Sequence, residues 1–273
     1  MDFSNLDFRK DKSDTEIRED GLLYCTRCNE ALQRRFHIEG AAEDIVLTGN
    51  CSCRAAAQEK QDAEERRIKM ARRIESYRAD GIDNPVYLDY TFKADDSPNS
   101  TPSVLAKQYV KSFGKMRRNG IGIIMYGTVG TGKTFYAACI ANALIDNDVR
   151  VKMTTLSKII GGAFGDNNWR DKLNRYQLLI LDDLGAERQT DYALEIAHAV
   201  IDDRVTSGLP LIVTTNLSEE DMMNVDNLTL KRVYDRVLAA CPIDIVLTGA
   251  SRRMAARGDR RSEAIDILMG EED

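Results

Sequence analysis

Short apolar runs alternate with longer amphipathic stretches in the part of the chain that follows residue 100. The apolar runs occupy residues 122–126, 149–154, 178–181, 211–213 and 243–247. Between them lie stretches with apolar residues at helical spacing, such as 104–118 and 135–144. Strands that alternate with helices along a chain form parallel sheets. The pattern therefore predicts an α/β domain built on a five-stranded parallel sheet.

The region before this domain is dominated by charged residues. Residues 54–80 combine alanine and charged side chains with apolar residues at helical spacing, which predicts a long exposed helix. Its second half carries the cationic residues Arg66, Arg67, Lys69, Arg72, Arg73 and Arg78. These residues suit contact with phosphates or an acidic protein, and a solvated linker explains them equally well. Prolines in 83–102 mark a boundary, so we expect a linker at 54–84 and the large domain at 85–273.

Four of the six cysteines lie in residues 1–53, as a C-x-x-C pair and a C-x-C pair separated by 22 residues. They are Cys25, Cys28, Cys51 and Cys53. Paired thiolates at close spacing are typical of zinc sites, where each pair holds one side of a tetrahedral ion. His37 lies between the pairs and could replace one thiolate. Four protein ligands leave no position for water, so we expect a structural Zn²⁺ rather than a catalytic one.

The composition of the whole chain narrows the classes of partner and compartment. The formal net charge of −6 over 273 residues argues against a protein that coats nucleic acid through its overall charge. No apolar run approaches the roughly 20 residues that cross a bilayer, and the first residues lack the apolar segment of a signal peptide. We therefore expect a cytoplasmic protein that makes no membrane contact.

The most specific motif is G-x-x-x-x-G-K-[ST], which follows the first predicted strand of the sheet and precedes a predicted helix. It consists of Gly127, Thr128, Val129, Gly130, Thr131, Gly132, Lys133 and Thr134. The glycines let backbone N–H groups turn inward around phosphate oxygens, the lysine reaches the β- and γ-phosphates, and the hydroxyl binds Mg²⁺. The helix N-terminus would face the phosphates. The motif predicts a site for a nucleoside triphosphate and Mg²⁺, with Thr134 as a metal ligand.

Two later strands end in polar side chains at the edge where ligands bind in open α/β sheets. Asp182 and Asp183 follow the third apolar run, and we expect Asp182 to hold Mg²⁺ and Asp183 to act as general base. Many related ATPases carry glutamate at the second position, so we expect slow hydrolysis or help from Glu187. Asn216 follows the fourth run and could orient the attacking water or contact the γ-phosphate. A turn-forming asparagine is the alternative interpretation.

Arginines near the C-terminus complete the candidate catalytic groups. Arg232 and Arg236 lie four residues apart, on one face of a predicted helix. An arginine supplied to the γ-phosphate of a neighbouring subunit stabilises the charge that develops there during transfer. Arg252 and Arg253 follow the last strand, where an arginine could reach the nucleotide of its own subunit. For any single arginine, a surface ion pair is the more frequent explanation.

These motifs together resemble the bacterial replicative DNA helicase loader family, DnaC/DnaI type, within the AAA+ P-loop ATPases. The resemblance covers roughly residues 85–260, and the run 181–187 with the cysteine module favours the DnaI-like branch. It implies an ATPase with ATP as substrate that loads the hexameric replicative helicase onto single-stranded DNA during initiation of DNA replication. In this family the N-terminal region binds the helicase, the AAA+ domain binds single-stranded DNA, and the subunits assemble through the ATP site.

The resemblance also implies roles for individual residues. The octapeptide is Walker A, and Asp182 with Asp183 is Walker B. Asn216 matches sensor 1, and Arg236 the arginine finger. Arg253 matches sensor 2, with Arg252 as the adjacent alternative. The family's DNA contacts would fall near 156–169, where the basic or aromatic residues are Lys158, Phe164 and Trp169. Core packing explains the two aromatic residues equally well.

Two other functions remain open at the level of sequence. A transposition helper ATPase of the IstB type shares this core but acts on duplex DNA with a transposase, and the cysteine module only weakly favours the loader. The other function is a zinc- and ATP-dependent adaptor that scarcely hydrolyses its nucleotide, which the short side chain of Asp183 would permit. The release of phosphate with and without single-stranded DNA distinguishes the adaptor from the loader.

Overall fold

The computed structural model describes residues 14–40, 43–166, 168–187, 190–252, 261, 264–265 and 267–269. Internal contacts divide the chain into two compact units, Met1–Ala71 and Arg72–Asp273. The division falls inside α1 (Ser52–Gly81), earlier than the boundary that the prolines indicated at 84/85. Among the described residues, no helix is both long and apolar enough to cross a membrane.

The first unit contains two small antiparallel sheets. Their strands are β1 (Thr15–Ile17) with β2 (Leu23–Cys25), and β3 (Gln33–Phe36) with β4 (Ile45–Thr48). The buried core of this unit is small and consists of Cys25, Leu32 and Cys51, with Cys28 and Cys53 packed against them. So few apolar residues cannot supply much burial free energy, and small units of this kind usually depend on a metal or on disulfides.

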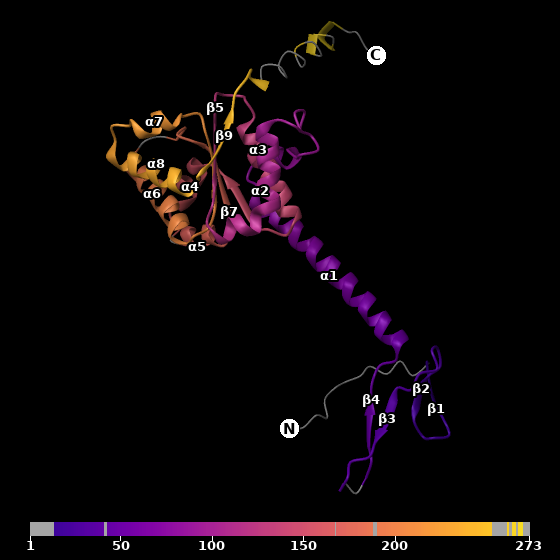
Figure 1. The fold of residues 1–273 in the computed structure, drawn as a ribbon. Helices are drawn as coiled ribbons and strands as arrows, with labels where there is room; N and C mark the ends of the chain where they lie inside the picture. The colour runs from indigo at the N-terminus through magenta and orange to yellow at the C-terminus, as the bar shows by residue number, and fades with distance from the viewer. Residues whose placement is uncertain are drawn as a thin grey trace. The chain divides into compact units, whose positions relative to one another are not determined.

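The second unit is built on a five-stranded sheet whose neighbouring strands are all parallel (Figure 1). The strands are β5 (Ile123–Gly127), β6 (Val151–Thr154), β7 (Leu178–Leu184), β8 (Leu211–Thr215) and β9 (Ile243–Leu247). Their order across the sheet is β6-β7-β8-β5-β9. This arrangement confirms the α/β fold that the sequence predicted. It also places the ends of β5, β7 and β8 side by side.

Helices cover both faces of this sheet, as Figure 1 shows. The first face carries α2 (Thr101–Arg118), α3 (Lys133–Asp146) and the 3-10 helix η2 (Pro85–Asp89). The second face carries α4 (Leu156–Ala163), α5 (Trp169–Asn174), α6 (Asp191–Thr206), α7 (Glu219–Met223) and α8 (Leu228–Ala240). Along β5, Ile123 and Met125 pack on the first face, whereas Ile124 and Tyr126 pack on the second. Burial on both faces explains why the strands are continuously apolar.

The segment that follows α1 packs on the domain core rather than forming a free linker. Ile82 is buried and bridges to Met153 of β6, and Tyr87, Tyr90 and Phe92 pack against the core of the first face. Asn142 of α3 donates hydrogen bonds to the carbonyl oxygens of Tyr87 and Tyr90, at 2.8 and 2.9 Å. The stretch 82–92 is therefore an integral layer of the ATPase unit.

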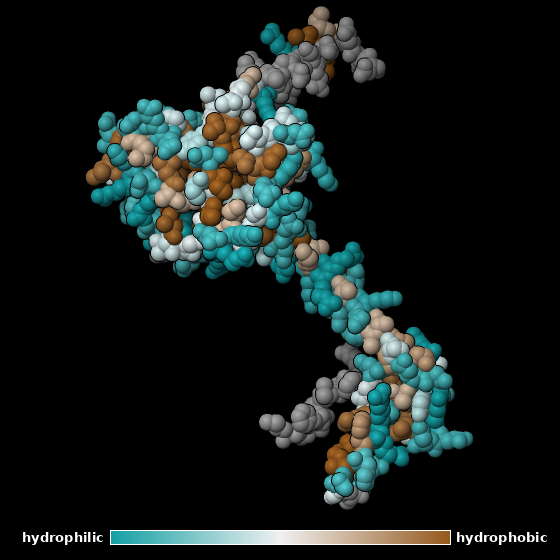
Figure 2. All heavy atoms as spheres, viewed as in Figure 1, coloured by the Kyte–Doolittle hydropathy of each residue, from teal (hydrophilic) through white to brown (hydrophobic). Residues whose placement is uncertain are grey.

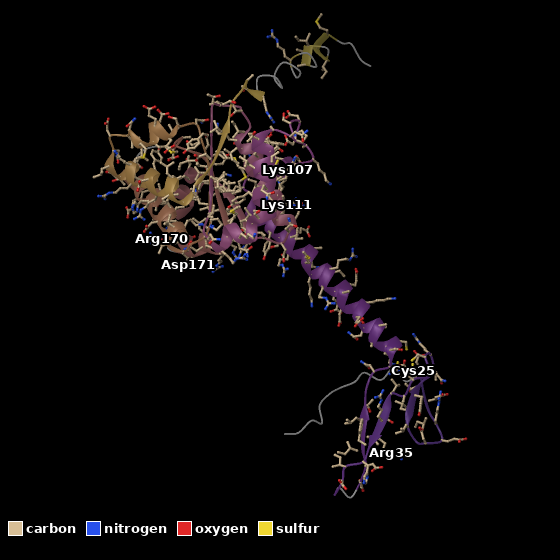
Figure 3. All side chains as sticks on the ribbon, in the orientation of Figure 1. Cys25, Arg35, Lys107, Lys111, Arg170 and Asp171 are labelled. Atoms are coloured by element: carbon tan, nitrogen blue, oxygen red, sulfur yellow. The ribbon has the colours of Figure 1, made fainter. Side chains whose placement is uncertain are left out.

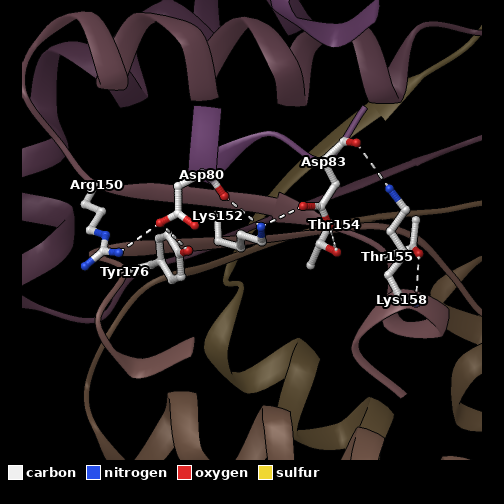
Figure 4. Close-up of polar contacts among 8 residues, drawn as sticks. All are labelled: Asp80, Asp83, Arg150, Lys152, Thr154, Thr155, Lys158 and Tyr176. Carbon is white, nitrogen blue, oxygen red and sulfur yellow. Dashed lines mark hydrogen bonds and ion pairs between the residues drawn. The ribbon is translucent and has the colours of Figure 1, made fainter. Parts of the chain in front are cut away.

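A polar latch joins the end of α1 to the edge strand β6 (Figure 4). The Asp80 carboxylate accepts hydrogen bonds from Arg150 at 2.9 Å and from Tyr176 at 2.8 Å. Asp83 forms a 2.6 Å ion pair with Lys152, whose ammonium also donates to the Asp80 carbonyl oxygen at 2.8 Å. These contacts fix the position at which the chain enters η2, and η2 in turn leads to the cleft described next.

Candidate nucleotide-binding site

A cleft of about 610 Å³ opens at the carboxyl ends of β5, β7 and β8. Its lining residues are Tyr87, Tyr90, Ala94, Asp96, Val129, Gly130, Gly132, Lys133, Thr134, Phe135, Thr155, Asp182, Asp183, Asn216 and Arg252. The volume lies within the range typical of sites for small molecules and cofactors. The structure thus brings most of the expected site residues to one edge of the sheet.

The loop between β5 and α3 requires glycine at three positions. Gly127, Gly130 and Gly132 have φ values of 147°, 86° and 105°, a region that side chains disfavour. A Cβ on Gly127 would lie 2.2 Å from the Leu247 carbonyl oxygen, and one on Gly130 would lie 2.1 Å from the hydroxyl of Ser251. The turn delivers the first residues of α3 to the cleft, where the N–H groups at a helix N-terminus attract phosphate oxygens.

The ammonium group of Lys133 lies at the base of this loop. It donates hydrogen bonds to the carbonyl oxygens of Gly127 and Thr128, at 2.6 and 2.9 Å, and to Oδ1 of Asn216 at 2.8 Å. Lys133 is 6% exposed, so its charge is largely shielded from water. A buried cation at this position provides strong attraction for a phosphate that enters the loop.

The carboxylate of Asp182 accepts hydrogen bonds from the hydroxyl groups of three residues on separate elements. Oδ1 accepts hydrogen bonds from Thr134 at 2.9 Å and from Thr214 at 2.7 Å, and Oδ2 accepts one from Tyr87 at 3.2 Å. Burial, followed by the nearby charge of Asp182, raises the pKa of Tyr87. One carboxylate beside one hydroxyl suits Mg²⁺, which binds few protein groups and retains several waters. The structure brings Thr134 and Asp182, the two residues that the sequence predicted to hold Mg²⁺, into direct contact.

Asp183 adopts a left-handed backbone conformation, and its carboxylate lies beside Asn216 in the lining of the cleft. Its φ is 61°, and the register of β7 with β8 shifts between Leu181 and Leu184. The backbone N–H of Asp183 donates to the hydroxyl of Thr214 at 2.8 Å, and its Oδ1 accepts from Nδ2 of Asn216 at 2.9 Å. A bulge of this kind commonly redirects a side chain next to an active site. Asn216 consequently connects Lys133 with Asp183.

Glu187, the other carboxylate considered for catalysis, has a different role. It accepts a hydrogen bond from the backbone N–H of Gly185 at 3.0 Å and is not among the residues that line the cleft. Gly185 has a φ of 96°, so the Glu187 carboxylate supports the turn that leaves β7. The structure gives no support to the expectation that Glu187 assists Asp183.

The expected arginines occupy different places. Arg252 lines the cleft, forms a 3.1 Å ion pair with Asp96, and donates its backbone N–H to the Gly130 carbonyl oxygen at 2.9 Å. Arg253, the other candidate in this motif, lies outside the described residues. Arg236 forms an ion pair with Asp202 of α6 and does not line the cleft of its own chain.

Comparison with known proteins agrees with this geometry. The family described as IstB-like ATP binding protein matches residues 54–259, which include the whole cleft. The chain belongs to this family of ATP-binding proteins. The matched residues begin after Cys53, so the cysteine module is an addition ahead of the family core.

Several relatives of this family member are named helicase loaders. The replicative helicase loader DnaI of Bacillus subtilis is 26% identical, over 84% of this chain and 78% of its own length. The replicative helicase loader DnaC of Escherichia coli K12 is 26% identical, over 75% of this chain and 83% of its own length. A putative ATP-binding protein in an insertion sequence of Mycobacterium tuberculosis is 29% identical, over 52% of this chain and 59% of its own length.

Solved structures show the same fold. The crystal structure of DnaI has a TM-score of 0.54 and 21% identity, covering 64% of this chain and 98% of that chain. The crystal structure of the DnaC helicase loader has a TM-score of 0.53 and 20% identity, covering 60% of this chain and 100% of that chain. The second unit of this IstB-like protein therefore has the AAA+ fold that the motifs predicted.

The four N-terminal cysteines form one cluster, as the spacing predicted. Their sulfur atoms all lie within 4.8 Å of one another, with Cys25 and Cys53 at 3.5 Å and Cys51 and Cys53 at 3.3 Å. Tetrahedral zinc with bonds of about 2.3 Å requires sulfurs roughly 3.8 Å apart, so the arrangement fits this ion. A hydrogen bond from the backbone of Cys28 lowers the pKa of Cys25 to about 6, whereas the hydrogen bond with Cys51 raises the pKa of Cys53 to about 12. Cys25 is therefore the thiol of this pair that ionises first.

His37 does not belong to this cluster. Its side chain is 76% exposed, and Nδ1 lies 2.8 Å from a carboxylate oxygen of Asp44. The suggestion that it replaces a cysteine ligand is wrong, because the hairpin β3–β4 carries it away from the four sulfurs. Among the described residues, the cysteines alone form a cluster suited to a metal ion.

Two residues of the nucleotide site were missed at the level of sequence. Thr214 bridges Asp182 and Asp183, and its place in the polar end of β8, two residues before Asn216, was the available signal. Tyr87 lies 95 residues before Asp182, in a segment that the prolines marked as a boundary. No local pattern connects Tyr87 with a Walker motif.

Proposed function

We propose that this protein is an ATP-dependent loader of the hexameric replicative DNA helicase onto single-stranded DNA, acting in the cytoplasm during initiation of replication. The observation that carries the proposal is the cleft, in which phosphate-binding, metal-binding and water-orienting groups converge. The relationship to DnaI adds support because it covers 84% of the chain, more than the ATPase unit alone provides.

The cleft suits hydrolysis of ATP. Lys133 would bind the β- and γ-phosphates, and Thr134 and Asp182 would hold Mg²⁺, which neutralises charge that develops on the phosphates. Asp183 is positioned to accept a proton from a water that Asn216 orients, because Nδ2 of Asn216 already lies 2.9 Å from the Asp183 carboxylate. The side chain of Asp183 is one methylene shorter than the glutamate found in many related ATPases. We therefore expect slow turnover of ATP, which DNA accelerates.

Completion of the site by a neighbouring subunit is part of the proposal. Arg236 is 39% exposed and does not line its own cleft, so it is available to reach the nucleotide of an adjacent copy. Arg252, in contrast, lines the cleft of its own chain. When a nucleotide binds, the Arg252 side chain would leave its ion pair with Asp96 and bind a phosphate instead. ATP binding would in this way favour association of the subunits, and hydrolysis of ATP would favour their dissociation.

The first unit would bind the helicase, with zinc holding its four cysteines together. The hairpin β3–β4 presents an apolar face to solvent: Phe36 pairs with Ile45, and Leu47 lies on the same face two residues further along. These side chains are 46%, 44% and 57% exposed. Figure 2 shows hydrophobic residues at the surface of this hairpin. Exposed apolar faces of this kind are typical of protein interaction sites.

Co-purification with the candidate replicative helicase, in ATP and in ADP, tests the function. We expect the wild-type chain to retain the helicase in ATP and to lose most of it in ADP. Leu47→Asp should abolish the association, whereas Val46→Asp, on the opposite face of the same hairpin, should retain it. Failure of the wild-type chain to bind the helicase in either nucleotide would refute the loader function.

A second candidate function is a helper ATPase in transposition. Both the family description and the relative in the Mycobacterium tuberculosis insertion sequence favour it. That relative, however, aligns with 52% of this chain, whereas DnaI aligns with 84%. Recovery of a transposase and no helicase from the native cell would make this the better reading.

A further inference from the structure

Helix α2 differs in charge from the rest of the chain. Its 18 residues include five cations and no aspartate or glutamate, in a protein whose formal net charge is −6. The cations are Lys107, Lys111, Lys115, Arg117 and Arg118. One side of α2 is buried, through Ala106, Tyr109 and Phe113, against the core of the first sheet face. The concentration of positive charge therefore lies on the outer side of the domain.

Four of these cations form a single row. Lys107, Lys111, Lys115 and Arg118 lie within an arc of about 80° around the helix axis, and successive members are spaced about 4.5 to 6 Å along it. Figure 3 shows Lys107 and Lys111 one after the other on α2. Gly114 has no side chain to project beside this row. A Cβ at this position would lie 4.0 Å from the guanidinium group of Arg118.

The row contains cations that carboxylates do not neutralise. Elsewhere in the ATPase unit, Arg73 pairs with Asp148, Arg150 with Asp80, and Lys172 with Asp166. No described carboxylate forms an ion pair with Lys111, Lys115 or Arg118. Lys107 is partly engaged, since it donates to the Pro98 carbonyl oxygen at 2.9 Å. Unneutralised charges held in a row create a local positive potential that attracts a polyanion.

We propose that this outer face of α2, here called the α2 row, binds the sugar-phosphate backbone of single-stranded DNA. The row places one cation on each turn of α2, in a single line. A single strand of DNA has one sugar-phosphate backbone, so its phosphates also follow a single line. An acidic protein is a poorer fit, because protein interfaces centre on apolar side chains. From 107 to 118 the exposed residues are Gln108, Lys111, Gly114, Lys115, Arg117 and Arg118. The exposed apolar residues of α2, Val104 and Leu105, lie at the start of the helix, so they do not form the centre of the cationic surface.

The inference rests on the proposed function and adds a contact on α2 to the DNA contacts that the family resemblance predicts near residues 156–169. None of the residues of the α2 row lines the nucleotide cleft, so DNA affinity and ATP affinity are separable by substitution. Contacts with phosphates make affinity depend on salt, since each contact releases a counterion from the strand. For single strands, the logarithm of the association constant falls with the logarithm of salt concentration by about 0.7 per contact.

The test is the variant Lys111→Gln/Lys115→Gln/Arg118→Gln, titrated with a fluorescent oligo-dT strand at several salt concentrations in the presence of ATP. We expect weaker binding at low salt and a salt slope that is smaller by about 2, from three lost contacts. The matched control is Arg34→Gln/Lys60→Gln/Lys231→Gln, which removes three exposed cations that lie outside α2. It should keep the wild-type slope. Both variants should bind ATP like the wild-type chain, which verifies the fold of the ATPase unit.

Three results would overturn the inference. An unchanged slope in the α2 variant would show that the row does not contact phosphates. Loss of helicase co-purification with normal DNA binding would assign the row to an acidic protein partner. The wild-type chain could also bind a DNA duplex as tightly as oligo-dT, and the α2 variant could lose equal affinity for both. That result would exclude a contact specific to single strands. If instead the wild-type chain binds oligo-dT through the α2 row but never the helicase, the loader function fails and this inference stands.

Discussion

At the scale of single residues, Thr214 is the side chain that connects the two acidic residues of the cleft. Its hydroxyl donates to Asp182 at 2.7 Å and accepts from the backbone N–H of Asp183 at 2.8 Å. Thr214 is 1% exposed, so no water can take over either bond without a rearrangement. Thr215, the next residue, makes an equivalent pair of buried bonds, donating to the Leu184 carbonyl and accepting from the Leu217 N–H.

The neighbouring threonines allow a matched experiment. Thr214→Val leaves the Asp183 N–H without its acceptor, which should cost about 1 to 3 kcal/mol of unfolding free energy. Thr215→Val should cost a similar amount through the Leu217 N–H. Of the two variants, only Thr214→Val should also lower the ATP turnover rate by tenfold or more, because Thr214 contacts Asp182 and Thr215 does not. Urea unfolding and phosphate release measure the two effects. Equal turnover in the two variants would contradict a positioning role for Thr214.

At the scale of elements, the latch at the end of α1 depends on ionised carboxylates. The hydrogen bond from Arg150, followed by the one from Tyr176, lowers the pKa of Asp80. A carboxylate with a lowered folded-state pKa stabilises the fold above its unfolded pKa of about 3.9, and this contribution is lost as the pH falls through the folded value. Asp80 is 48% exposed, so solvent screening keeps the contribution small.

A variant of Asp80 tests this contribution. Asp80→Asn should lower the unfolding free energy at pH 7 by up to about 1 kcal/mol. The difference from the wild-type chain should diminish as the pH falls below about 4 and vanish once the pH lies below the folded-state pKa of Asp80, where both side chains are neutral. Glu75→Gln, an equal charge change on the exposed surface of α1, serves as the control and should change little. A deficit of Asp80→Asn that stays unchanged throughout an acid titration to the point of acid unfolding would show that the effect is not electrostatic.

The cysteine module gives a second prediction at the element scale. Its buried core is small, so we expect β1 to β4 to stay together only when the four thiolates close around an ion. Treatment with a strong chelator should release about one zinc per chain and expose the first unit to proteolysis. Nucleotide binding by the ATPase unit should persist. A gently purified chain with well under one zinc, or a module that resists protease after chelation, would contradict the metal assignment.

At the scale of the whole molecule, Arg252 is the only arginine among the described residues that line the cleft, and we propose that a neighbouring subunit supplies a second one. Arg236 lies on α8, paired with Asp202, while its expected target is a γ-phosphate. We expect Arg236→Ala to lower DNA-stimulated ATPase activity by about 10³-fold, as removal of such fingers does in related phosphoryl transfer. Lys231→Ala, an exposed cation on the same helix, should remain active.

A mixing experiment shows whether the arginine acts between subunits. Arg236→Ala subunits retain an intact cleft, and Lys133→Ala subunits retain the arginine. Each variant should be inactive alone, and the mixture should recover part of the wild-type activity at the shared sites. Full activity of Arg236→Ala by itself would exclude the finger, and inactivity of the mixture would exclude its action on a neighbour.

Local sequence was sufficient for the five strands of the parallel sheet, for the helices α1, α2 and α3, and for the phosphate loop. The apolar runs became β5 to β9 because burial on both faces of a sheet demands them, and the glycines of the loop are dictated by positive φ. The spacing of the cysteines was enough to predict their cluster. These features depend on periodicity and backbone conformation within a few residues, so the sequence by itself determined them.

Long-range packing decided the rest. The hexapeptide Asp-Ile-Val-Leu-Thr-Gly occurs at 44–49 and at 244–249 and forms a strand in both places. In β4 it is exposed, whereas in β9 Ile245 and Leu247 are buried beside β5. Likewise, Tyr87 and Asp182 meet only because α1 is latched to β6 and η2 packs on α3. Such contacts depend on strand order and layer packing, which a local pattern does not encode, so only the tertiary structure decided them.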